Sequence, residues 1–393
     1  MKRNLYILIL CFSLPAGLFA QSTVSEVLNS IELHNKTIQA GQKLKQARQL
    51  ENRTNNNLAN PTVELNQLWA KNGGGKNANE LAVVQSFDFP SAYIHINKLI
   101  KSQNTVSDLQ YASTRQEILL AAQQTCLEII YLQQQKRLLE RRLKNTALLT
   151  QLYQKRLESG DANQLEYNKI LLEKINAENA SRLNAANLQA QSDILQQLNG
   201  GVVISFSDSI FPILPPLPEF SQLEAAYLAA DPKLNSLAEE SRTAEQEIKV
   251  NRALSLPKFD IGYRRNGGSE EKMNGFKIGM SIPLWESKNT VKQAKAQAEY
   301  ANAYMEDNTL NLKITLQQLY GQAQALEISR KAYQTALSSQ QNELLLNKAL
   351  KAGQISMLDY FVEINMLYES IQNYLDIEKE YQTILAQLFQ YTL

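Results

Sequence analysis

Apolar residues recur at spacings of three and four in the last forty or so positions of the chain. These spacings place them on one face of an α-helix and are typical of a coiled-coil seam. Glu378 is the one polar residue in the series, and the other helix faces are rich in Gln, Asn, Lys and Glu, as a surface in water requires. The apolar series consists of Met357, Tyr360, Ile364, Leu367, Ile371, Tyr374, Tyr381, Leu385 and Leu388.

Proline and glycine positions set the length of the predicted helices. Proline is absent from residues 91–211 and 284–393, and because proline breaks helices, both regions can be helical. Each contains one turn-like glycine, Gly160 or Gly353, which suits the left-handed conformation at a helix C-terminus. Asp161 or Asn163 could cap the helix after the first turn. We therefore predict long helices over residues 91–158, 163–198, 286–351 and 355–390.

Four other segments alternate between apolar and polar residues with period two, which predicts strands. We place these strands at about residues 61–69, 80–89, 257–264 and 275–283. The glycine-rich turns 72–77 and 266–268 join them into two hairpins. The residues predicted to share one apolar face are Val63, Leu65, Leu81, Val83, Phe87, Phe259, Ile261, Tyr263, Phe276, Ile278 and Met280.

Two interpretations of these strands are open. A soluble sheet packed on a helical core shows this alternation, and so does a membrane strand with one side toward lipid. The strand length of about 8–10 residues is close to that of membrane strands, and the hairpins lie at the ends of helices too long to fold back into a compact core. Aromatic residues also cluster on the strands and at their ends, as in interfacial girdles: Trp69, Phe87, Phe89, Phe259, Tyr263, Phe276 and Trp285.

The membrane interpretation carries a physical requirement. Four strands cannot close a barrel, and open sheet edges do not occur in hydrocarbon. Several chains must therefore pool their strands if these segments lie in a membrane, and cyclic symmetry is the natural way to do so.

The two halves of the chain form an internal repeat. Gly160 and Gly353 are 193 positions apart, and so are Pro90 and Pro283. The triplets Leu165-Glu166-Tyr167 and Leu358-Asp359-Tyr360 share that offset. Each half has the order helix, strand pair, long helix, glycine turn, helix. We predict a first repeat over residues 21–198, a proline-rich crossover over 199–220 and a second repeat over 221–393.

The first 20 residues have the features of an export signal. Lys2 and Arg3 precede an apolar stretch from Leu5 to Leu14, and a short segment ends at Ala20. This order predicts a signal peptide cleaved near Ala20. No later apolar run approaches the length of a transmembrane helix, which excludes the helical bundle of an inner-membrane transporter.

Composition and motifs argue against an enzyme, a metal site and a nucleic-acid partner. The chain has 40 Lys and Arg against 39 Asp and Glu, two Cys and two His. The chain therefore has no excess of basic residues for binding nucleic acid, and it has too few cysteines for a disulfide-stabilised fold. The Gly73-Gly74-Gly75 run lacks the Lys-Ser/Thr pair of a nucleotide-binding loop. No nucleophile has a base nearby in a known pattern. We expect no cofactor and no catalytic or metal-binding residues.

With these features together, the chain resembles the TolC family of outer-membrane efflux proteins. The resemblance rests on export, two copies of a hairpin plus a long helical hairpin, Asn60-Pro61 before the first strand, and a glycine turn followed by Leu-acid-Tyr. It covers about residues 23–391, and it points to the shorter members that serve metal-cation and drug exporters.

The resemblance implies a mainly α fold with a small β part. Three chains would form a homotrimer with a 12-stranded outer-membrane β-barrel and a periplasmic α-helical tunnel. The chain would be a passive exit duct for small molecules or metal cations. Its partners would be outer-membrane lipid, a periplasmic adaptor and an inner-membrane pump, which we expect to be of the resistance-nodulation-division type.

The resemblance also suggests roles for the two glycine turns, which would meet the adaptor. The residues expected there are Gly160, Asp161, Leu165, Tyr167, Gly353, Ile355, Leu358 and Tyr360. The family's closed entrance commonly carries acidic residues after the second glycine, and Asp359 occupies a matching place, with Glu166 as its counterpart. A further family acid is Val362 here, and an arginine of some members is Ile355.

Several alternatives remain open at this stage. Asp359 and Glu166 could form an entrance gate that favours cations, or could be first-turn carboxylates that stabilise a helix N-terminus. The whole chain could instead be a soluble periplasmic coiled-coil scaffold or adaptor-like protein, whose apolar strand faces would be covered by protein.

Overall fold

The structure is a computed structural model that describes residues 23–69, 78–213, 215–267, 273–338 and 342–393. The predicted signal peptide and the predicted turn at residues 72–77 lie outside these residues. The described residues form two compact units. The described residues of one lie within 23–30 and Thr125–Pro212, and those of the other lie within Ile31–Gln124 and Ile213–Leu393. These units do not coincide with the two sequence repeats.

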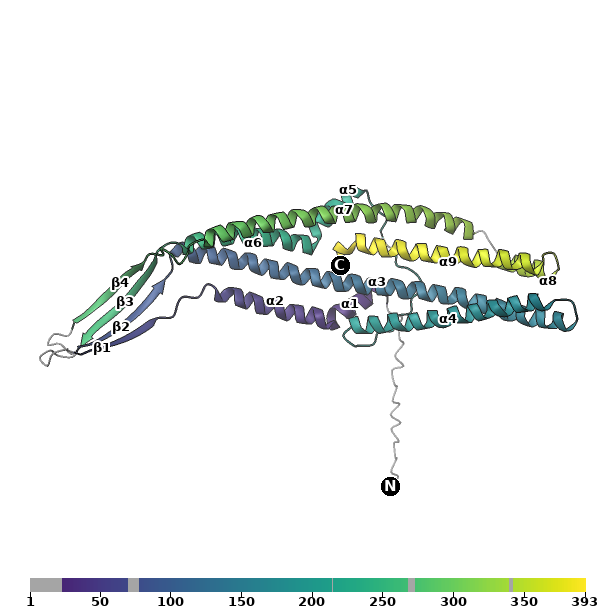
Figure 1. Ribbon diagram of the computed structural model, residues 1–393, viewed down its shortest axis with the longest axis horizontal. Coiled ribbons are helices and arrows are strands. Elements are labelled where there is room, and N and C mark those ends of the chain that lie inside the picture. Colours follow the sequence, from purple (N-terminus) through teal and green to yellow (C-terminus); the bar gives the residue numbers. More distant parts are fainter. Residues whose placement is uncertain (1–22, 70–77, 214, 268–272, 339–341) are drawn as a thin grey trace, which may run out of the picture. The chain divides into compact units, whose positions relative to one another are not determined.

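Helices make up most of the described chain, as the sequence predicts, and each repeat has two helices before its strand pair (Figure 1). The first-repeat helices are α1 (Val24–His34), α2 (Lys36–Thr54), α3 (Pro90–Glu158) and α4 (Gln164–Leu198). The second-repeat helices are α5 (Phe220–Ala230), α6 (Pro232–Leu254), α7 (Thr290–Ser338), α8 (Asn342–Lys351) and α9 (Met357–Leu388), followed by the 3-10 turn η1 (Gln390–Thr392). Helix α3 has 69 residues and passes from one compact unit into the other.

The predicted helix over residues 286–351 is wrong at its start. It begins later, at Thr290, because residues 285–288 form a turn and Asn289 has a positive φ of 70°. Its described helical residues are those of α7 and α8, and residues 339–341 between them lie outside the part of the chain that the structure describes.

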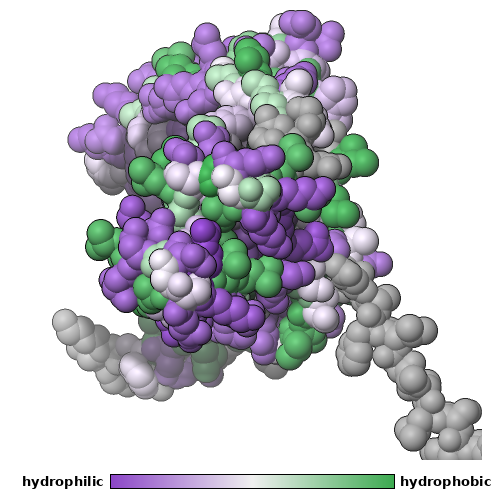
Figure 2. Space-filling view, turned by 90° about the vertical axis from the view of Figure 1, so that its right-hand side faces the viewer, coloured by the Kyte–Doolittle hydropathy of each residue, from purple (hydrophilic) through white to green (hydrophobic). Residues whose placement is uncertain are grey.

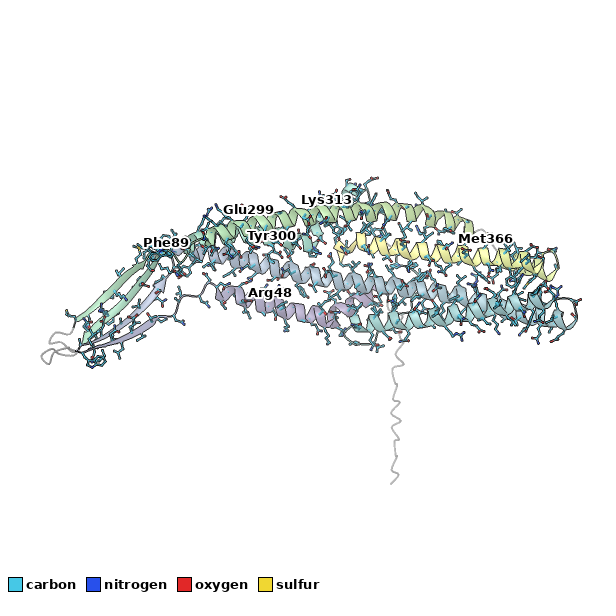
Figure 3. The ribbon with its side chains drawn as sticks, viewed as in Figure 1. Arg48, Phe89, Glu299, Tyr300, Lys313 and Met366 are labelled. Carbon is cyan, nitrogen blue, oxygen red and sulfur yellow. The ribbon has the colours of Figure 1, made fainter. Side chains whose placement is uncertain are left out.

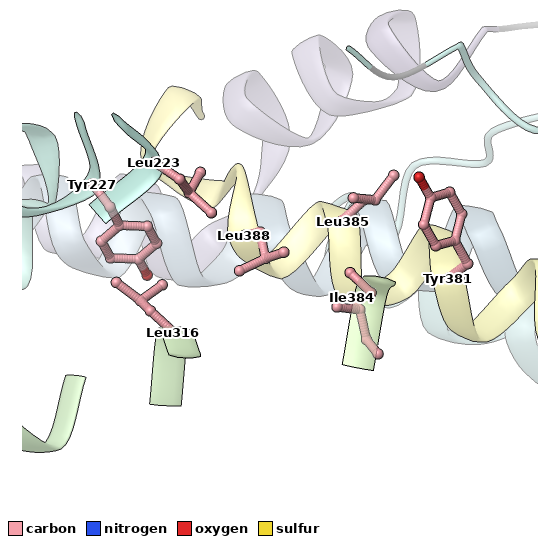
Figure 4. Packing of buried hydrophobic residues seen from close by; sticks show 8 residues of the cluster. Leu223, Tyr227, Leu316, Tyr381, Ile384, Leu385 and Leu388 are labelled. Atoms are coloured by element: carbon pink, nitrogen blue, oxygen red, sulfur yellow. The ribbon is translucent and has the colours of Figure 1, made fainter. Parts of the chain in front are cut away.

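The second compact unit has a core between α5, α7 and α9, in which leucine, isoleucine and tyrosine side chains interlock (Figure 4). Leu316 of α7 and Leu388 of α9 are 1% and 0% exposed, so this seam is dry. Burying such a side chain contributes about 1.5–3 kcal/mol. The members are Leu223, Tyr227, Leu316, Ala323, Tyr381, Ile384, Leu385 and Leu388.

Glu378, the polar break in the seam, is buried and has partners. Arg330 Nη1 of α7 lies 3.4 Å from Glu378 Oε2, and Gln382 Nε2 donates to Glu378 Oε1 at 2.9 Å. The Arg330 guanidinium also lies over the Tyr381 ring, 5.1 Å from its centroid. Glu378 therefore favours one register between α7 and α9, because a shift would leave a buried charge without its partner and would destabilise the fold.

On the face of the molecule shown in Figure 2, apolar residues occur singly or in small groups among hydrophilic ones. Among the described residues, no helix is long and apolar enough to cross a lipid bilayer.

The four strands form one antiparallel sheet in the order β1-β2-β3-β4. Their bounds are β1 (Thr62–Leu68), β2 (Ala78–Phe87), β3 (Lys258–Gly267) and β4 (Met273–Ser281). Each repeat contributes one hairpin, and β2 of the first repeat pairs with β3 of the second (Figure 1). β1 and β4 are therefore the two edges of the sheet.

Candidate functional site

The turn after α3 has the geometry predicted for its glycine. Gly160 has a φ of +79°, which favours glycine because other residues are strained there. The Asp161 N–H donates to the Arg156 carbonyl oxygen at 2.7 Å, and the Gly160 N–H donates to that of Leu157 at 3.2 Å. These bonds form a Schellman motif that ends the helix.

The turn after α8 repeats this geometry at the same sequence offset. Gly353 has a φ of +69°. The Gln354 N–H donates to the Ala349 carbonyl oxygen at 2.9 Å, and the Gly353 N–H donates to that of Leu350 at 3.1 Å. The repeat read from the sequence thus has the same hydrogen bonds in both copies.

The two predicted gate residues, Glu166 and Asp359, are part of capping boxes. Asn163 caps α4, and its Oδ1 accepts from the Glu166 N–H at 2.9 Å, while Glu166 Oε2 accepts from the Asn163 N–H at 3.1 Å. Ser356 caps α9 with Asp359 in the same way, at 3.1 and 3.3 Å. Both carboxylates therefore hold a helix start. Their role in an entrance gate stays a prediction.

The other predicted turn residues differ in exposure. Leu165 and Leu358 occupy equivalent places and are 73% and 60% exposed, so both apolar side chains lie on the surface of the chain. Asp161 is exposed and accepts from the Ser159 hydroxyl at 2.8 Å, so Asn163 and not Asp161 caps α4. Ile355 and Tyr167 are partly buried.

Tyr360, another of the predicted turn residues, is buried in the chain. It is 0% exposed, and its hydroxyl lies 3.1 Å from Asn347 Oδ1 of α8. Tyr360 therefore holds α8 against α9 within this chain, and its part in adaptor docking stays a prediction. The periodic seam, in which Tyr360 also appears, is the signal that identifies it as a core residue.

The sheet places all eleven residues of the predicted apolar face on one side. Residues paired directly across antiparallel strands share a face, and one such row runs Val63, Val83, Tyr263, Phe276. The next row in β3 and β4 pairs Ile261 with Ile278. We call this side the apolar face. Side chains on it are exposed in the chain, among them Phe276 at 88%.

The opposite side, the polar face, carries charged, small and hydroxyl residues. Arg264 of β3 forms an ion pair with Glu80 of β2, and the Ser86 hydroxyl donates to Asp260 Oδ1 at 2.5 Å. Gly262 also lies there, and a Cβ on it would meet the Val83 carbonyl oxygen at 2.6 Å. A side chain at position 262 would therefore clash with the neighbouring strand, which explains the glycine. Lys277, paired with Gly262, adds a positive charge to the polar face on β4.

A pocket between α2, α3, α6 and α7 is the feature that the sequence patterns did not reveal. Its volume is about 680 Å³. Its polar and aromatic lining residues include Glu51, Gln103, Glu240, Glu247, Tyr300 and Tyr304. The signal available in the sequence was the four-residue spacing of Tyr300 and Tyr304, which places two rings on one helix face. Figure 3 shows Tyr300 on α7 and Arg48, another lining residue, on α2.

Comparison with known proteins supports the family resemblance. Residues 225–392 match the family model described as "Outer membrane efflux protein". This range lies within the second repeat, where the resemblance read from the sequence is confirmed. None of the curated protein sequences matches the chain.

Solved structures extend the likeness to nearly the whole fold. CusC is 16% identical and has a TM-score of 0.71, over 95% of this chain and 92% of its own. VceC of Vibrio cholerae is 13% identical with a TM-score of 0.75, over 94% and 95%. The Campylobacter jejuni CmeC outer membrane channel is 13% identical with a TM-score of 0.72, over 95% and 86%. At these identities the likeness concerns the fold.

Proposed function

We propose that this chain is an outer membrane efflux protein, the exit duct of a tripartite export system. The family match and the fold shared with CusC, VceC and CmeC support this assignment. The proposed duct carries small molecules or metal cations from an inner-membrane pump to the outside and does no chemistry of its own. The pump, which we take to be of the resistance-nodulation-division type, supplies the energy.

The observation that carries the proposal is the sheet with one exposed apolar face. In water, such a face would leave Val63, Leu65, Phe276 and Ile278 solvated, which is unfavourable by about 25 cal/mol for each Å² of apolar surface. In a bilayer the same face lies against lipid. The polar face then lies toward a lumen.

The sheet edges account for the proposed trimer. β1 and β4 are edge strands, and their backbone groups need partners in hydrocarbon. Pairing β4 of one chain with β1 of the next satisfies both edges. Three chains with four strands each give a 12-stranded barrel, which exceeds the eight-strand minimum for a membrane barrel.

The turns after α3 and α8 are the proposed docking points for the periplasmic adaptor. The exposed leucines Leu165 and Leu358 stand one position before the acidic residue of each capping box. An adaptor that presents helical hairpins could pack apolar side chains against both. The rigid Schellman and capping-box bonds fix the orientation of each leucine.

Outer-membrane fractionation followed by gentle detergent extraction and mass determination tests this function. We expect recovery in the outer membrane as a complex of three chains. Recovery as a soluble periplasmic monomer or dimer would contradict the duct and would favour the coiled-coil scaffold, with the apolar face covered by another protein.

Asp359→Asn tests the proposed gate separately from the helix cap. The asparagine Oδ1 can still accept from the Ser356 N–H, whereas the three negative charges of an Asp359 ring are lost. We expect the preference for cations over anions in planar bilayers to fall by about two- to fivefold, with little change in thermal stability.

Ser356→Ala is the matched control for that experiment. It removes the cap and keeps the charge, so we expect α9 to lose about 1 kcal/mol of stability while ion selectivity is retained. If Asp359→Asn leaves ion selectivity unchanged, then Asp359 serves only the helix start.

A further inference from the structure

The pocket between α2, α3, α6 and α7 lies wholly within the second compact unit. These four helices adjoin the strands in order, because α2 precedes β1, α3 follows β2, α6 precedes β3 and α7 follows β4. Residues of all four helices line the pocket. In the proposed assembly, we take the pocket to open toward the tunnel through which cargo passes.

Two tyrosines give the pocket an aromatic wall. The rings of Tyr300 and Tyr304 stack with centroids 5.8 Å apart and an interplanar angle of 14°. They are nevertheless 60% and 46% exposed. An exposed pair of stacked rings offers a flat surface to another aromatic ring, and its negative π-faces attract a cation.

Glu247 supplies a carboxylate that has no partner in the chain. Among the described residues, no hydrogen bond or ion pair reaches its side chain, and burial raises the pKa of the carboxyl above its ordinary value. Glu240, in contrast, accepts from Gln110 Nε2 at 2.9 Å and from the Ser236 hydroxyl at 3.1 Å. Within the pocket, Glu247 is thus the half-buried carboxylate still open to a cation.

A second acceptor in the pocket also lacks a donor. Gln103 Oε1 of α3 is buried and has no hydrogen-bond partner. Buried polar atoms are normally paired, so this oxygen can accept a hydrogen bond from a water molecule or from a bound ligand. The charges agree with this, since the three carboxylates Glu51, Glu240 and Glu247 line the pocket against one guanidinium, Arg48.

We propose that this pocket is a transient binding site for an organic cation that has a flat aromatic ring system and N–H donors. Its ring stacks on Tyr300, and its donors bind the Glu247 carboxylate and Gln103 Oε1. The role in transit rests on the proposed duct function, whereas the binding site itself stands on the pocket alone.

Ethidium, a planar aromatic cation with two amino groups, is the probe for this site. We expect saturable binding to the detergent-solubilised full chain, measured by fluorescence polarisation. Glu247→Gln removes the charge, keeps the shape and weakens binding by about tenfold. Tyr300→Ala weakens it by about fivefold. Neither change disturbs the core, because Glu247 has no partner and Tyr300 is exposed.

Glu299→Gln is the matched control. Glu299 precedes Tyr300 on α7, is exposed and does not line the pocket (Figure 3). Its loss removes the same charge from the same part of the chain, so we expect unchanged affinity. Neutral acridine controls for the charge of the probe, and we expect it to bind at least tenfold more weakly than ethidium.

Three results would overturn the site: no saturable ethidium binding, equal affinity of the Glu247→Gln and Glu299→Gln variants, or acridine binding as tight as that of ethidium. Conductance of the wild-type chain in planar bilayers tests the duct separately. Conductance without ethidium binding would contradict the binding site and support the duct function. Ethidium binding without conductance would support the binding site and contradict its role in transport.

Discussion

Ile278→Arg is expected to cause the largest loss of assembled protein. Ile278 is 83% exposed in the middle of β4 and pairs with Ile261 on the apolar face. If this face meets lipid, an arginine there costs about 2–4 kcal/mol per chain, and a trimer carries three copies. We expect the yield of trimer in the outer-membrane fraction to fall by at least tenfold.

Gly275→Arg is the matched control, because Gly275 lies on the polar face of the same strand. A Cβ at Gly275 meets nothing within 4 Å, so a side chain fits there. We expect this variant to assemble like the wild type, since its arginine points toward a lumen. Equal yields of the Ile278→Arg and Gly275→Arg trimers would show that the two faces of the sheet lie in the same environment. This result would contradict the proposed membrane barrel.

Gly353→Val is expected to have the second largest effect. Gly353 has a φ of +69°, and nothing lies within 4 Å of a Cβ built on it. The cost is therefore conformational rather than steric, about 1–3 kcal/mol for a β-branched residue held in the left-handed region. We expect the turn to shift, with less trimer or weaker export, measured as trimer yield and as efflux from the native host.

Gly353→Asn is the control for that substitution. Asparagine adopts the left-handed conformation more readily than other non-glycine residues, so it preserves the turn while adding a side chain. We expect Gly353→Asn to retain most of the trimer and most of the efflux. If Gly353→Val behaves like the wild type in both measurements, the glycine turn has no bearing on docking or folding.

Local signals predicted the parts of the fold that depend on a few neighbouring residues. Gly160 and Gly353 end their helices where expected, because the left-handed turn is a property of the glycine itself. The strand alternation predicted which side chains share a face, because that depends only on the pleat. The late start of α7 at Thr290 was missed, because an asparagine such as Asn289, unlike a glycine, adopts the left-handed conformation only occasionally.

Two further helix boundaries had signals that a closer reading of caps would have found. Asn35 caps α2 by accepting from the Ile38 N–H at 2.9 Å, and Asp231 caps α6 by accepting from the Leu234 N–H at 2.7 Å. Pro232 follows Asp231 at the first helical position, which is a recognised helix-start pattern.

The candidate pocket could not have been predicted in this way. Gln103, Glu247 and Tyr300 come from three helices that are far apart in the sequence. No local periodicity relates them, because their meeting depends on how α3, α6 and α7 pack. An unpaired carboxylate and an unpaired amide oxygen become visible only when every possible partner has been placed around them.

The pairing of β2 with β3 has a consequence for the order in which the protein folds. Ser86 and Asp260 are bonded across this pair although 174 positions separate them. Each hairpin can close locally within microseconds, whereas joining the hairpins must wait for a long loop to close. The second hairpin also emerges from the ribosome after the first. In the proposed export, the first hairpin therefore carries an unpaired edge at β2 and an exposed apolar face, and we expect it to depend on a periplasmic chaperone until β3 arrives.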